Sequence, residues 1–397
     1  MINYKTLIKS PNFQPYIKKM RDVNHHYEPF NYINKYHLEG DIWSHTMMVL
    51  DYVQNSLKSE DNDLYLVSLF HDIGKTYNYQ IDKKKRKIQF INHWFYSGNI
   101  FRDYFLSHNF IDRKNKEDIR NLFDLYRIVQ LHQINQFPQE IKDNLHKDLS
   151  YKNFLLLKDL CSADGKGRIL DEDIKEAGYD KYFEKYKTLS ENDFNNHYQH
   201  IHFSDPETVT TDLKELMNSS NHKKFVILLV APPASGKSTI ARKLSENSEF
   251  EVFTTGYDQI RLQLFCEKEY NDKTRYSMDT ATSEIYQKAY DYVNKNGIDI
   301  HSILMEKINN QLKNNDKIVI VVDNTNASFK SRRKIIHSLF KKEEIHKVGI
   351  FIFNLTLEEI FQRNEKRNIQ IKKSAVEHIY KTTAFPSLTE FDDIFVI

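Results

Sequence analysis

The chain has few cysteines and no long apolar run. It contains 2 cysteines, Cys161 and Cys266, in 397 residues. Two cysteines cannot form the disulfide network of a small secreted domain, so we interpret both as buried thiols. No apolar run approaches the roughly 18 residues that a membrane-spanning helix needs, and residues 1–10 lack the apolar core of a secretion signal. We therefore expect a cytoplasmic protein that does not enter a membrane.

The chain also lacks an excess of charge of one sign and any repeat of solenoid length. Its 57 Lys and Arg side chains nearly balance 55 Asp and Glu side chains, giving a net charge of +2. Overall charge therefore does not indicate a polyanionic partner, and any contact with nucleic acid must come from local patches. The length and the 40% hydrophobic content are sufficient for two or three folded domains.

The sequence pattern changes near residue 205. Residues 1–203 form apolar helical patterns separated by polar loops, which predicts an all-α domain. The composition of residues 204–222 predicts a linker that contains one short helix. Residues 223–397 alternate β-rich runs with amphipathic segments, which predicts an α/β domain whose parallel sheet is covered by helices on both faces, the P-loop kinase architecture. The strands we expect are Phe225–Val230, Phe250–Thr255, Lys317–Asp323 and Val348–Leu355.

The segment APPASGKST follows the first expected strand and occupies Ala231–Thr239. A glycine turn between a strand and a helix lets backbone N–H groups converge on phosphate oxygens, so we expect ATP with Mg²⁺ to bind there. Lys237 adds positive charge and Ser238 offers a hydroxyl to Mg²⁺. Ala231 replaces the first glycine of the G-x-x-x-x-G-K-[ST] pattern, which leaves the shape of the loop open. The expected nucleotide-binding residues are Ala234, Ser235, Gly236, Lys237, Ser238 and Thr239.

Further polar groups follow the other expected strands. Asp258 and Arg261 place a carboxylate and a cation at the crevice beside the sheet. Asp323 ends a strand, where it can hold Mg²⁺ through water or cap the next helix. Arg363 and Arg367 are four residues apart, so we expect both guanidinium groups on one helix face. They can bind a phosphate chain there, or form surface salt bridges.

Residues suited to a metal recur in the first half of the chain. They are His45, the pair His71-Asp72, and Asp164. Imidazole mixed with carboxylate suits Mn, Fe, Co, Ni or Zn, unlike the all-oxygen sites of Mg or Ca. A lone buried His–Asp pair is more often structural, so the metal interpretation depends on the recurrence of these groups along the chain.

Residues 37–168 resemble the HD phosphohydrolase superfamily, whose metal ligands follow the order His, His-Asp, Asp along a helical bundle. The resemblance implies that the four residues just named hold one or two transition metals such as Mn²⁺, Ni²⁺, Co²⁺, Zn²⁺ or Fe²⁺. It also implies that His93 and His132 bind a second metal or the scissile phosphate, although histidines are common here and both can be partly buried surface residues. A metal in such a site activates water for phosphoester hydrolysis.

Several cations accompany these candidate ligands. Lys75 matches the lysine of the H-D-x-G-K variant of the family and can stabilise a developing oxyanion, or else lie in solvent at a helix end. Lys166 and Arg168 follow Asp164 closely enough to contact phosphate. The basic run at residues 83–87 is most often a solvated loop, with a smaller chance that it guides a polyanion.

Residues 223–397 resemble the polynucleotide kinase branch of the P-loop phosphotransferases. The resemblance implies that Asp258 is the general base for a 5′-hydroxyl, that Arg261 binds phosphates, and that Arg363 and Arg367 match the R-N-x-x-R lid. Asp323 begins the family's Asp-x-Thr-Asn strand end.

The two parts together resemble the HD-Pnk family of bifunctional RNA end-healing enzymes. This resemblance implies removal of a 2′,3′-cyclic phosphate or 3′-phosphate by the first domain and ATP-dependent phosphorylation of a 5′-hydroxyl by the second. It further implies broken RNA or DNA ends as partners, and a separate RNA ligase that joins the healed ends. Two alternatives remain: a signalling or defence phosphohydrolase regulated by an ATP-sensing P-loop domain, and a binding module with a silent kinase half.

Overall fold

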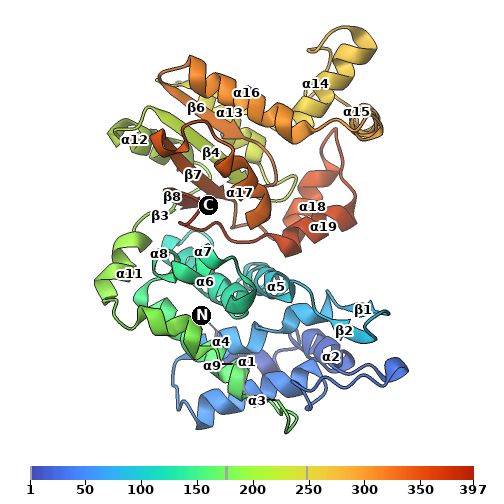
Figure 1. The fold of residues 1–397 in the computed structure, drawn as a ribbon, viewed down its shortest axis with the longest axis vertical. Coiled ribbons are helices and arrows are strands. Elements are labelled where there is room, and N and C mark those ends of the chain that lie inside the picture. The colour runs from blue at the N-terminus through green and yellow to red at the C-terminus, as the bar shows by residue number, and fades with distance from the viewer. Residues whose placement is uncertain (1, 175–177, 247–248) are drawn as a thin grey trace. The chain divides into compact units, whose positions relative to one another are not determined.

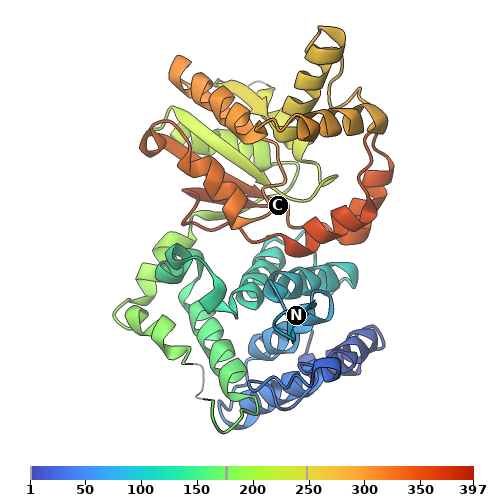
Figure 2. The same cartoon turned by 45° about the vertical axis from the view of Figure 1, so that its right-hand side comes forward.

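The computed structural model describes residues 2–174, 178–246 and 249–397 (Figures 1 and 2). The chain forms two compact units, unit 1 (Met1–Gln199) and unit 2 (His200–Ile397). Within the described ranges, no helix is both long enough and apolar enough to cross a membrane.

Unit 1 is a helical domain in which several helices begin at polar caps. The side chain of Asp41 accepts the backbone N–H of Ser44 at the start of α3, and Ser150 accepts that of Asn153 at the start of α9. The elements are α1 (Tyr4–Lys9), α2 (Gln14–Asp22), η1 (Glu28–Phe30), α3 (Ile42–Asn55), α4 (Asn62–Phe70), η2 (Ile73–Thr76), β1 (Gln80–Asp82), β2 (Lys87–Gln89), α5 (His93–Ser107), α6 (Lys116–Leu131), η3 (Ile134–Gln136), α7 (Gln139–Asp143), α8 (Leu145–Asp148), α9 (Tyr151–Lys166), α10 (Asp180–Phe183), η4 (Glu184–Tyr186) and α11 (Glu191–Tyr198).

The prediction that this domain is all-α is wrong in one segment. β1 and β2 pair antiparallel and form a small hairpin, and residues 83–86 of the basic run make its turn. Asp82 closes this turn because its carboxylate accepts the backbone N–H groups of Lys84 and Lys85. Arg86 takes a left-handed backbone conformation with a φ of 49°.

The candidate ligands of unit 1 lie where its central helices meet. His71 and His132 are the residues directly after α4 and α6, and His93 is the first residue of α5. His45 and Asp164 lie within α3 and α9. Packing among α3, α4, α5, α6 and α9 therefore brings these distant residues together.

Unit 2 contains a six-stranded, fully parallel sheet with the order β3-β8-β7-β4-β6-β5 (Figure 1). The prediction of a parallel sheet flanked by helices is confirmed, and two strands are added to it. The elements are β3 (Ile201–Phe203), α12 (Val209–Ser219), β4 (Lys224–Val230), α13 (Lys237–Ser245), β5 (Glu251–Thr255), α14 (Tyr257–Tyr270), α15 (Ser283–Lys295), α16 (Ile300–Asn314), β6 (Ile318–Val322), α17 (Phe329–His337), η5 (Lys342–Glu344), β7 (Ile345–Phe351), α18 (Leu357–Glu365), α19 (Lys373–Thr382) and β8 (Asp393–Val396).

The structure places the start of unit 2 slightly before the expected linker. β3 lies within the range expected for the first domain, yet Ile201 pairs with Ile394 of β8. The expected linker, residues 204–222, lies within unit 2 and contains α12, whose apolar side packs on the sheet.

The central strands β4 and β6 are buried on both sides because helices cover both faces of this sheet. Val319 and Val321 pack in one core cluster with α12, α13, α18 and α19. The alternate side chains of β6 point to the other face, where α16 packs on β5 and β6 (Figure 2).

Strand order also places three predicted site segments side by side. Val322 at the end of β6 pairs with Leu228 of β4 and with Thr255 of β5. Because the strands are parallel, the segments that follow β4, β5 and β6 leave the same edge of the sheet. Those segments are the P-loop, the start of α14 and the turn that begins at Asp323.

Candidate functional sites

Two groups of buried side chains in unit 1 share Asp72. In the first group, Asp72 Oδ2 lies 3.6 Å from His45 Nε2 and 3.4 Å from His71 Nε2. Asp164 joins this group, with its Oδ1 at 3.1 Å from His45 Nε2 and 3.8 Å from His71 Nε2. All four side chains are buried. The structure therefore brings together the four residues that the sequence predicted as metal ligands.

The second group lies on the other oxygen of the same carboxylate. Asp72 Oδ1 is 3.1 Å from His93 Nε2 and 3.5 Å from His132 Nε2. Both histidines are buried, which argues against the alternative that they are partly exposed surface residues. Asp72 thus lies between two sets of nitrogen donors, as a carboxylate that bridges two cations does.

The backbone fixes which ring nitrogen carries the proton in these histidines. A carbonyl oxygen only accepts hydrogen bonds, so an Nδ1 bonded to one is protonated and leaves Nε2 of a neutral ring as a bare lone pair. Three of the histidines bond through Nδ1 to the carbonyl three residues earlier: His71 to Ser68 at 2.7 Å, His93 to Phe90 at 2.9 Å and His132 to Val129 at 2.7 Å.

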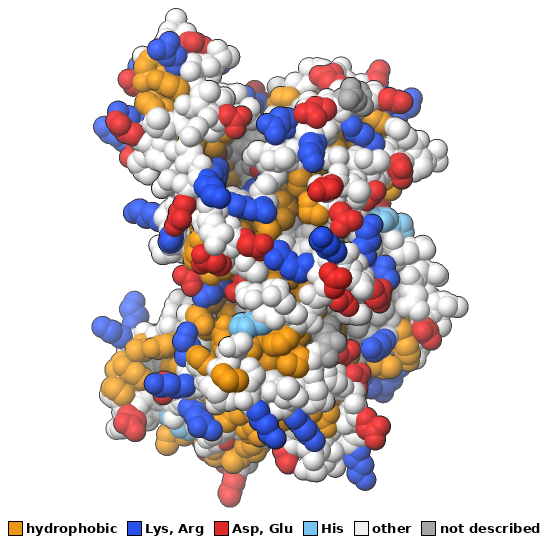
Figure 3. Space-filling model, turned by 180° about the vertical axis from the view of Figure 1, so that it is seen from behind, with side chains coloured by type: hydrophobic (Ala, Val, Ile, Leu, Met, Phe, Trp, Pro, Cys, Tyr) orange, Lys and Arg blue, Asp and Glu red, His pale blue; other side chains and the backbone are white. Residues whose placement is uncertain are grey.

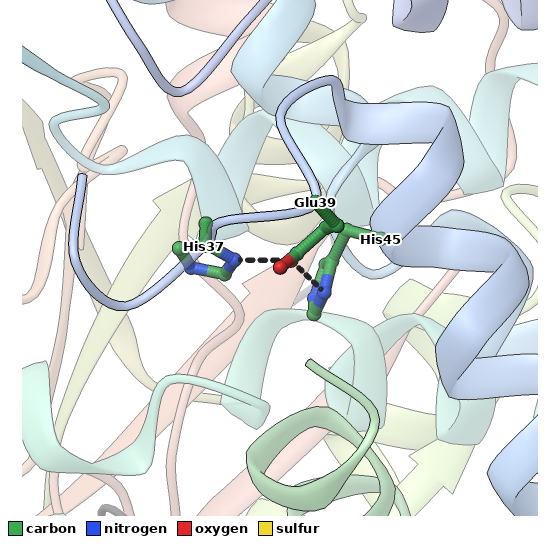
Figure 4. A group of neighbouring side chains, drawn as sticks. All are labelled: His37, Glu39 and His45. Carbon is green, nitrogen blue, oxygen red and sulfur yellow. Dashed lines mark hydrogen bonds and ion pairs between the residues drawn. The ribbon is translucent and has the colours of Figure 1, made fainter. Parts of the chain in front are cut away.

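Glu39 lies between His37 and His45 (Figure 4). Its Oε1 lies 2.9 Å from the Nδ1 atoms of both His37 and His45, and its Oε2 accepts the backbone N–H of Ile169 at 3.1 Å. Its side chain is 2% exposed. The contact with His45 is an ion-pair distance without hydrogen-bond geometry, whereas His45 Nε2 is within hydrogen-bond distance of Asp164 Oδ1. No pattern in the sequence pointed to Glu39, which lies two residues after His37.

Close approaches between ring nitrogens also indicate that the two groups fit a transition metal. Nε2 of His45 lies 3.3 Å from Nε2 of His71, and Nε2 of His93 lies 3.3 Å from Nε2 of His132. With protons on Nδ1 of both rings, His93 and His132 cannot form a hydrogen bond with each other, and their facing lone pairs repel. Among the described residues, Asp72 Oδ1 also has no hydrogen-bond donor. A cation within each group satisfies all of these atoms, and imidazole with carboxylate is the ligand set of Mn, Fe, Co, Ni or Zn.

Two buried cations keep the carboxylates ionised. Lys75 Nζ donates to Asp72 Oδ2 at 2.6 Å and to His25 Nε2 at 3.1 Å, so this lysine is not the solvated residue of the alternative interpretation. Arg168 donates to Asp164 Oδ1 at 2.6 Å and to its backbone oxygen at 2.7 Å. Burial alone raises the pKa of Asp72 and of Asp164, but Lys75 beside the first and Arg168 beside the second hold both pKa values well below the usual range.

The P-loop of unit 2 joins β4 to α13. Gly236 has a φ of 97°, a conformation that only glycine adopts readily, and Ala234 has a φ of 63°. Ala231 is not among the positive-φ residues of the described chain, so alanine fits at the first position of the motif. Its backbone N–H donates to Thr325 O at 3.1 Å, which anchors the loop to the turn after β6. The Thr239 N–H bonds to Gly236 O at 3.1 Å within the first turn of α13.

Lys237 is held against the loop itself. Its Nζ donates to Ala231 O at 3.2 Å and to Pro232 O at 2.7 Å. Burial lowers the pKa of Lys237 from 10.5 to about 8, with a further lowering by Arg367 and partial compensation by Asp323 and Asp258.

Ser238 and Asp323, each expected near Mg²⁺, lie side by side. The Ser238 hydroxyl donates to Asp323 Oδ2 at 2.6 Å. The alternative role of Asp323 as a helix cap is not seen, because Ser328 caps the next helix, α17. A hydroxyl and a carboxylate beside the P-loop are the oxygen ligands, direct or through water, that Mg²⁺ takes with nucleotide phosphates.

Asp258 lies in the first turn of α14 and is held by two donors. Arg261 Nη1 donates to its Oδ1 at 2.6 Å, and the Tyr286 hydroxyl donates to the same oxygen at 2.7 Å. The predicted pair of Asp258 and Arg261 therefore occurs in the structure. No signal in the sequence pointed to Tyr286, which belongs to another helix.

The prediction that Arg363 and Arg367 lie on one helix face is wrong. α18 ends at Glu365, and the Arg367 N–H bonds to Asn364 O in the turn beyond it. The Asn364 side chain pairs with both backbone groups of Ile371, which turns the chain back at this point. Both arginines still lie near the P-loop: Arg363 Nη1 is 3.9 Å from the Cβ position of Gly236, and the charge of Arg367 acts on Lys237.

Comparisons with known proteins bear on unit 2. Residues 226–383 match the AAA domain family. Fourteen chains of solved structures match, among them one described as "Structure of the Pnkp1/Rnl/Hen1 RNA repair complex", with 24% identity and a TM-score of 0.28. That match covers 42% of this chain and 46% of the other, so the chain spans less than half of that protein's length. No curated protein matches. The parallel sheet, the P-loop and the family match are together consistent with a P-loop kinase-like domain in unit 2.

Proposed function

We propose that the chain is a bifunctional nucleic-acid end-healing enzyme. Unit 2 transfers the γ-phosphate of ATP to a 5′-hydroxyl end, and unit 1 hydrolyses a 2′,3′-cyclic phosphate or 3′-phosphate end with the help of one or two transition metals. Broken RNA is the proposed partner, with a separate RNA ligase joining the healed ends. The proposal depends on two carboxylates that occur in one chain. Asp258 lies near the P-loop, where it can accept a proton, and Asp72 lies between two sets of imidazole nitrogens.

In unit 2, the P-loop and Lys237 hold the phosphates of ATP, and Ser238 and Asp323 hold its Mg²⁺. Lys237 leaves the carbonyl oxygens of Ala231 and Pro232 when phosphate oxygens replace them. Asp258 accepts the proton of the attacking hydroxyl, and Arg363 and Arg367 neutralise charge on the transferring phosphoryl group.

In unit 1, His45, His71, Asp72 and Asp164 would hold one metal and Asp72, His93 and His132 the second. The metals supply an activated water and charge neutralisation for phosphoester cleavage. Lys75 and Arg168 keep the carboxylates ionised, and Glu39 keeps His45 oriented. Because the proposed ligands and Lys75 are buried, they exclude bulk water from the reacting atoms.

Local contacts, not overall charge, must recognise the nucleic acid. On the face drawn in Figure 3, Lys and Arg side chains are interspersed with Asp and Glu side chains and form no continuous positive field. The net charge of +2 is in agreement with this distribution.

One assay tests both activities. An oligonucleotide with a 5′-hydroxyl and a 2′,3′-cyclic phosphate is incubated with the full chain, ATP and a panel of divalent metals, and both ends are analysed. We expect 5′-phosphorylation that needs ATP and Mg²⁺, and opening or removal of the terminal phosphate that needs a transition metal. Hydrolysis of small nucleotides without any reaction at either oligonucleotide end would instead favour the ATP-sensing signalling enzyme.

A further inference from the structure

Two tyrosines of α15 lie beside the candidate general base. Tyr286 and Tyr290 are four residues apart and therefore share one face of the helix. The Tyr286 hydroxyl donates to Asp258 Oδ1 at 2.7 Å, and the Tyr290 ring lies 5.0 Å from the guanidinium carbon of Arg261. The same helix face thus reaches both members of the predicted catalytic pair.

The contacts of Asp258 leave one of its oxygens for a substrate. Oδ1 is filled by Arg261 and Tyr286, whereas no described residue donates to Oδ2. The side chain is 42% exposed, so Oδ2 is open to solvent. Two donors on one oxygen fix the plane of a carboxylate, so Tyr286 helps to hold Oδ2 in one direction.

Tyr290 offers an aromatic surface at the same place. It is 40% exposed, although Ala289 and Val293 of the same helix are buried, the former in a small core. The guanidinium of Arg261 lies over its ring at cation–π distance, which restrains the ring. An exposed, restrained aromatic ring beside a cation is the arrangement on which single-stranded nucleic acids stack their bases.

We propose that Tyr290 is the stacking platform for the 5′-terminal nucleobase of a single-stranded acceptor, and that Tyr286 is a positioning residue for Asp258. The inference rests on the proposed kinase function and adds its substrate class: an unpaired 5′ end that is held by the face of its base. Every base has such a face, so recognition at this position is tolerant of sequence. A duplex end is a poorer substrate, because its terminal base is stacked and paired already.

Steady-state kinetics with a single-stranded 5′-hydroxyl oligonucleotide test the platform. For Tyr290→Ala, we expect the KM for the oligonucleotide to rise about tenfold, which corresponds to about 1.4 kcal/mol, with the KM for ATP unchanged. Tyr290→Phe restores the KM because it keeps the ring. Tyr270→Ala is the matched control, since Tyr270 is 44% exposed on α14 but contacts neither Asp258 nor Arg261.

An oligonucleotide with an abasic 5′-terminal nucleotide removes the base from the substrate, as Tyr290→Ala removes the ring from the protein. The wild-type chain should show the raised KM on this substrate, and Tyr290→Ala should add nothing further to it. If Tyr290→Ala raised the KM by the same factor for the normal and the abasic oligonucleotide, the stacking role of Tyr290 would be wrong. An unchanged KM for Tyr290→Ala on the normal oligonucleotide would also overturn it. A wild-type chain that phosphorylates no 5′-hydroxyl would instead overturn the proposed function itself.

The positioning role of Tyr286 is tested by measuring kcat and KM of the variant Tyr286→Phe separately. Tyr286→Phe removes one hydrogen bond to Asp258 and keeps the ring, so we expect kcat for the oligonucleotide to fall several-fold while its KM stays within twofold. A change confined to KM, or wild-type values of both constants, would overturn the positioning role.

Discussion

At the residue scale, Asp72 differs from the other candidate ligands because each of its oxygens faces a separate pair of histidines. Oδ2 faces His45 and His71, and Oδ1 faces His93 and His132. Replacement of Asp72 should therefore reduce the metal content more than replacement of a histidine that contacts only one group.

Metal analysis of purified variants tests this difference. We expect about two transition-metal ions per wild-type chain, as in two-metal hydrolytic sites. Asp72→Ala should lose both, whereas His93→Ala should lose about one, because His93 contacts only the second group. His108→Ala is the control, since its Nδ1 bonds to Tyr104 O. Undiminished metal in Asp72→Ala would remove this residue from the metal site.

Lys237 gives unit 2 a dependence of stability on pH. Its pKa is about 8 in the folded chain and 10.5 when unperturbed. Between these values the unfolded state binds more protons than the folded state, so the free energy of unfolding rises with pH across this window, by at most about 3 kcal/mol. Bound ATP should remove the rise, because phosphate oxygens favour the charged lysine.

Denaturant unfolding of the nucleotide-free chain from pH 8 to pH 10 measures this effect against Lys237→Met, which lacks the titrating group. The free energy of unfolding of the wild type, relative to that of the variant, should increase with pH. Parallel profiles of the two proteins would show that burial of Lys237 has no energetic cost.

At the element scale, one buried ion pair joins α17 to the segment that leads into β8. Arg332 is fully buried, and its Nη2 donates to Glu390 at 2.7 Å and to Phe385 O at 2.9 Å. Its Nη1 donates to Asn326 O at 3.1 Å and to Ala384 O at 3.2 Å. Burial raises the pKa of Glu390 even though Arg332 opposes the shift, so this carboxylate depends on its partner.

Replacement of Arg332 should therefore destabilise unit 2 specifically. Arg332→Leu leaves the Glu390 carboxylate buried without its counterion, for which we expect a loss of about 3–5 kcal/mol in the unfolding free energy. The second change Glu390→Gln should recover part of this loss, because it removes the unpaired charge. Lys330→Ala, on the exposed side of the same helix, is the control. Thermal unfolding in which Arg332→Leu behaves as the control would contradict this role.

The elements that could be predicted from the sequence are those whose pattern lies within a short stretch of residues. β4 and β6 are uninterrupted aliphatic runs, and the P-loop is a glycine turn between a strand and a helix, so each is visible in a short window. β3 and β8 have three and four residues and pair with each other from distant parts of the chain, which no short window shows. Short strands of this kind depend on their partners for their conformation.

The same limit applies within the candidate sites. The order His, His-Asp, Asp was visible in the sequence, and the structure brings those residues together. Glu39 and Tyr286 were missed because their roles depend on loops and helices that pack against His45 and Asp258 only in the folded chain. The end of α18 before Arg367 was missed for a different reason: a local pairing of the Asn364 side chain with the Ile371 backbone turns the chain, and it overrides the helical spacing of the two arginines.

At the scale of the whole molecule, each unit contains every group of its own candidate site. The metal-site residues lie in Met1–Gln199 and the P-loop site residues in His200–Ile397. Asp72 and Asp258 therefore belong to separate compact bodies, and the chemistry proposed for one site needs no side chain from the other.

The two activities should consequently be separable by single changes in the full-length chain. Asp258→Ala removes the proton acceptor for the 5′-hydroxyl, so we expect phosphorylation to fall about 100-fold or more, while hydrolysis at the 3′ end stays within a few fold. Asp72→Ala should have the opposite effect, because it removes ligands from unit 1 and leaves the P-loop intact. Both ends of one labelled oligonucleotide, analysed over the same time course, give the two rates in a single reaction. Loss of hydrolysis in Asp258→Ala, or of phosphorylation in Asp72→Ala, would mean that the reactions share a site, and the assignment of one reaction to each unit would be wrong.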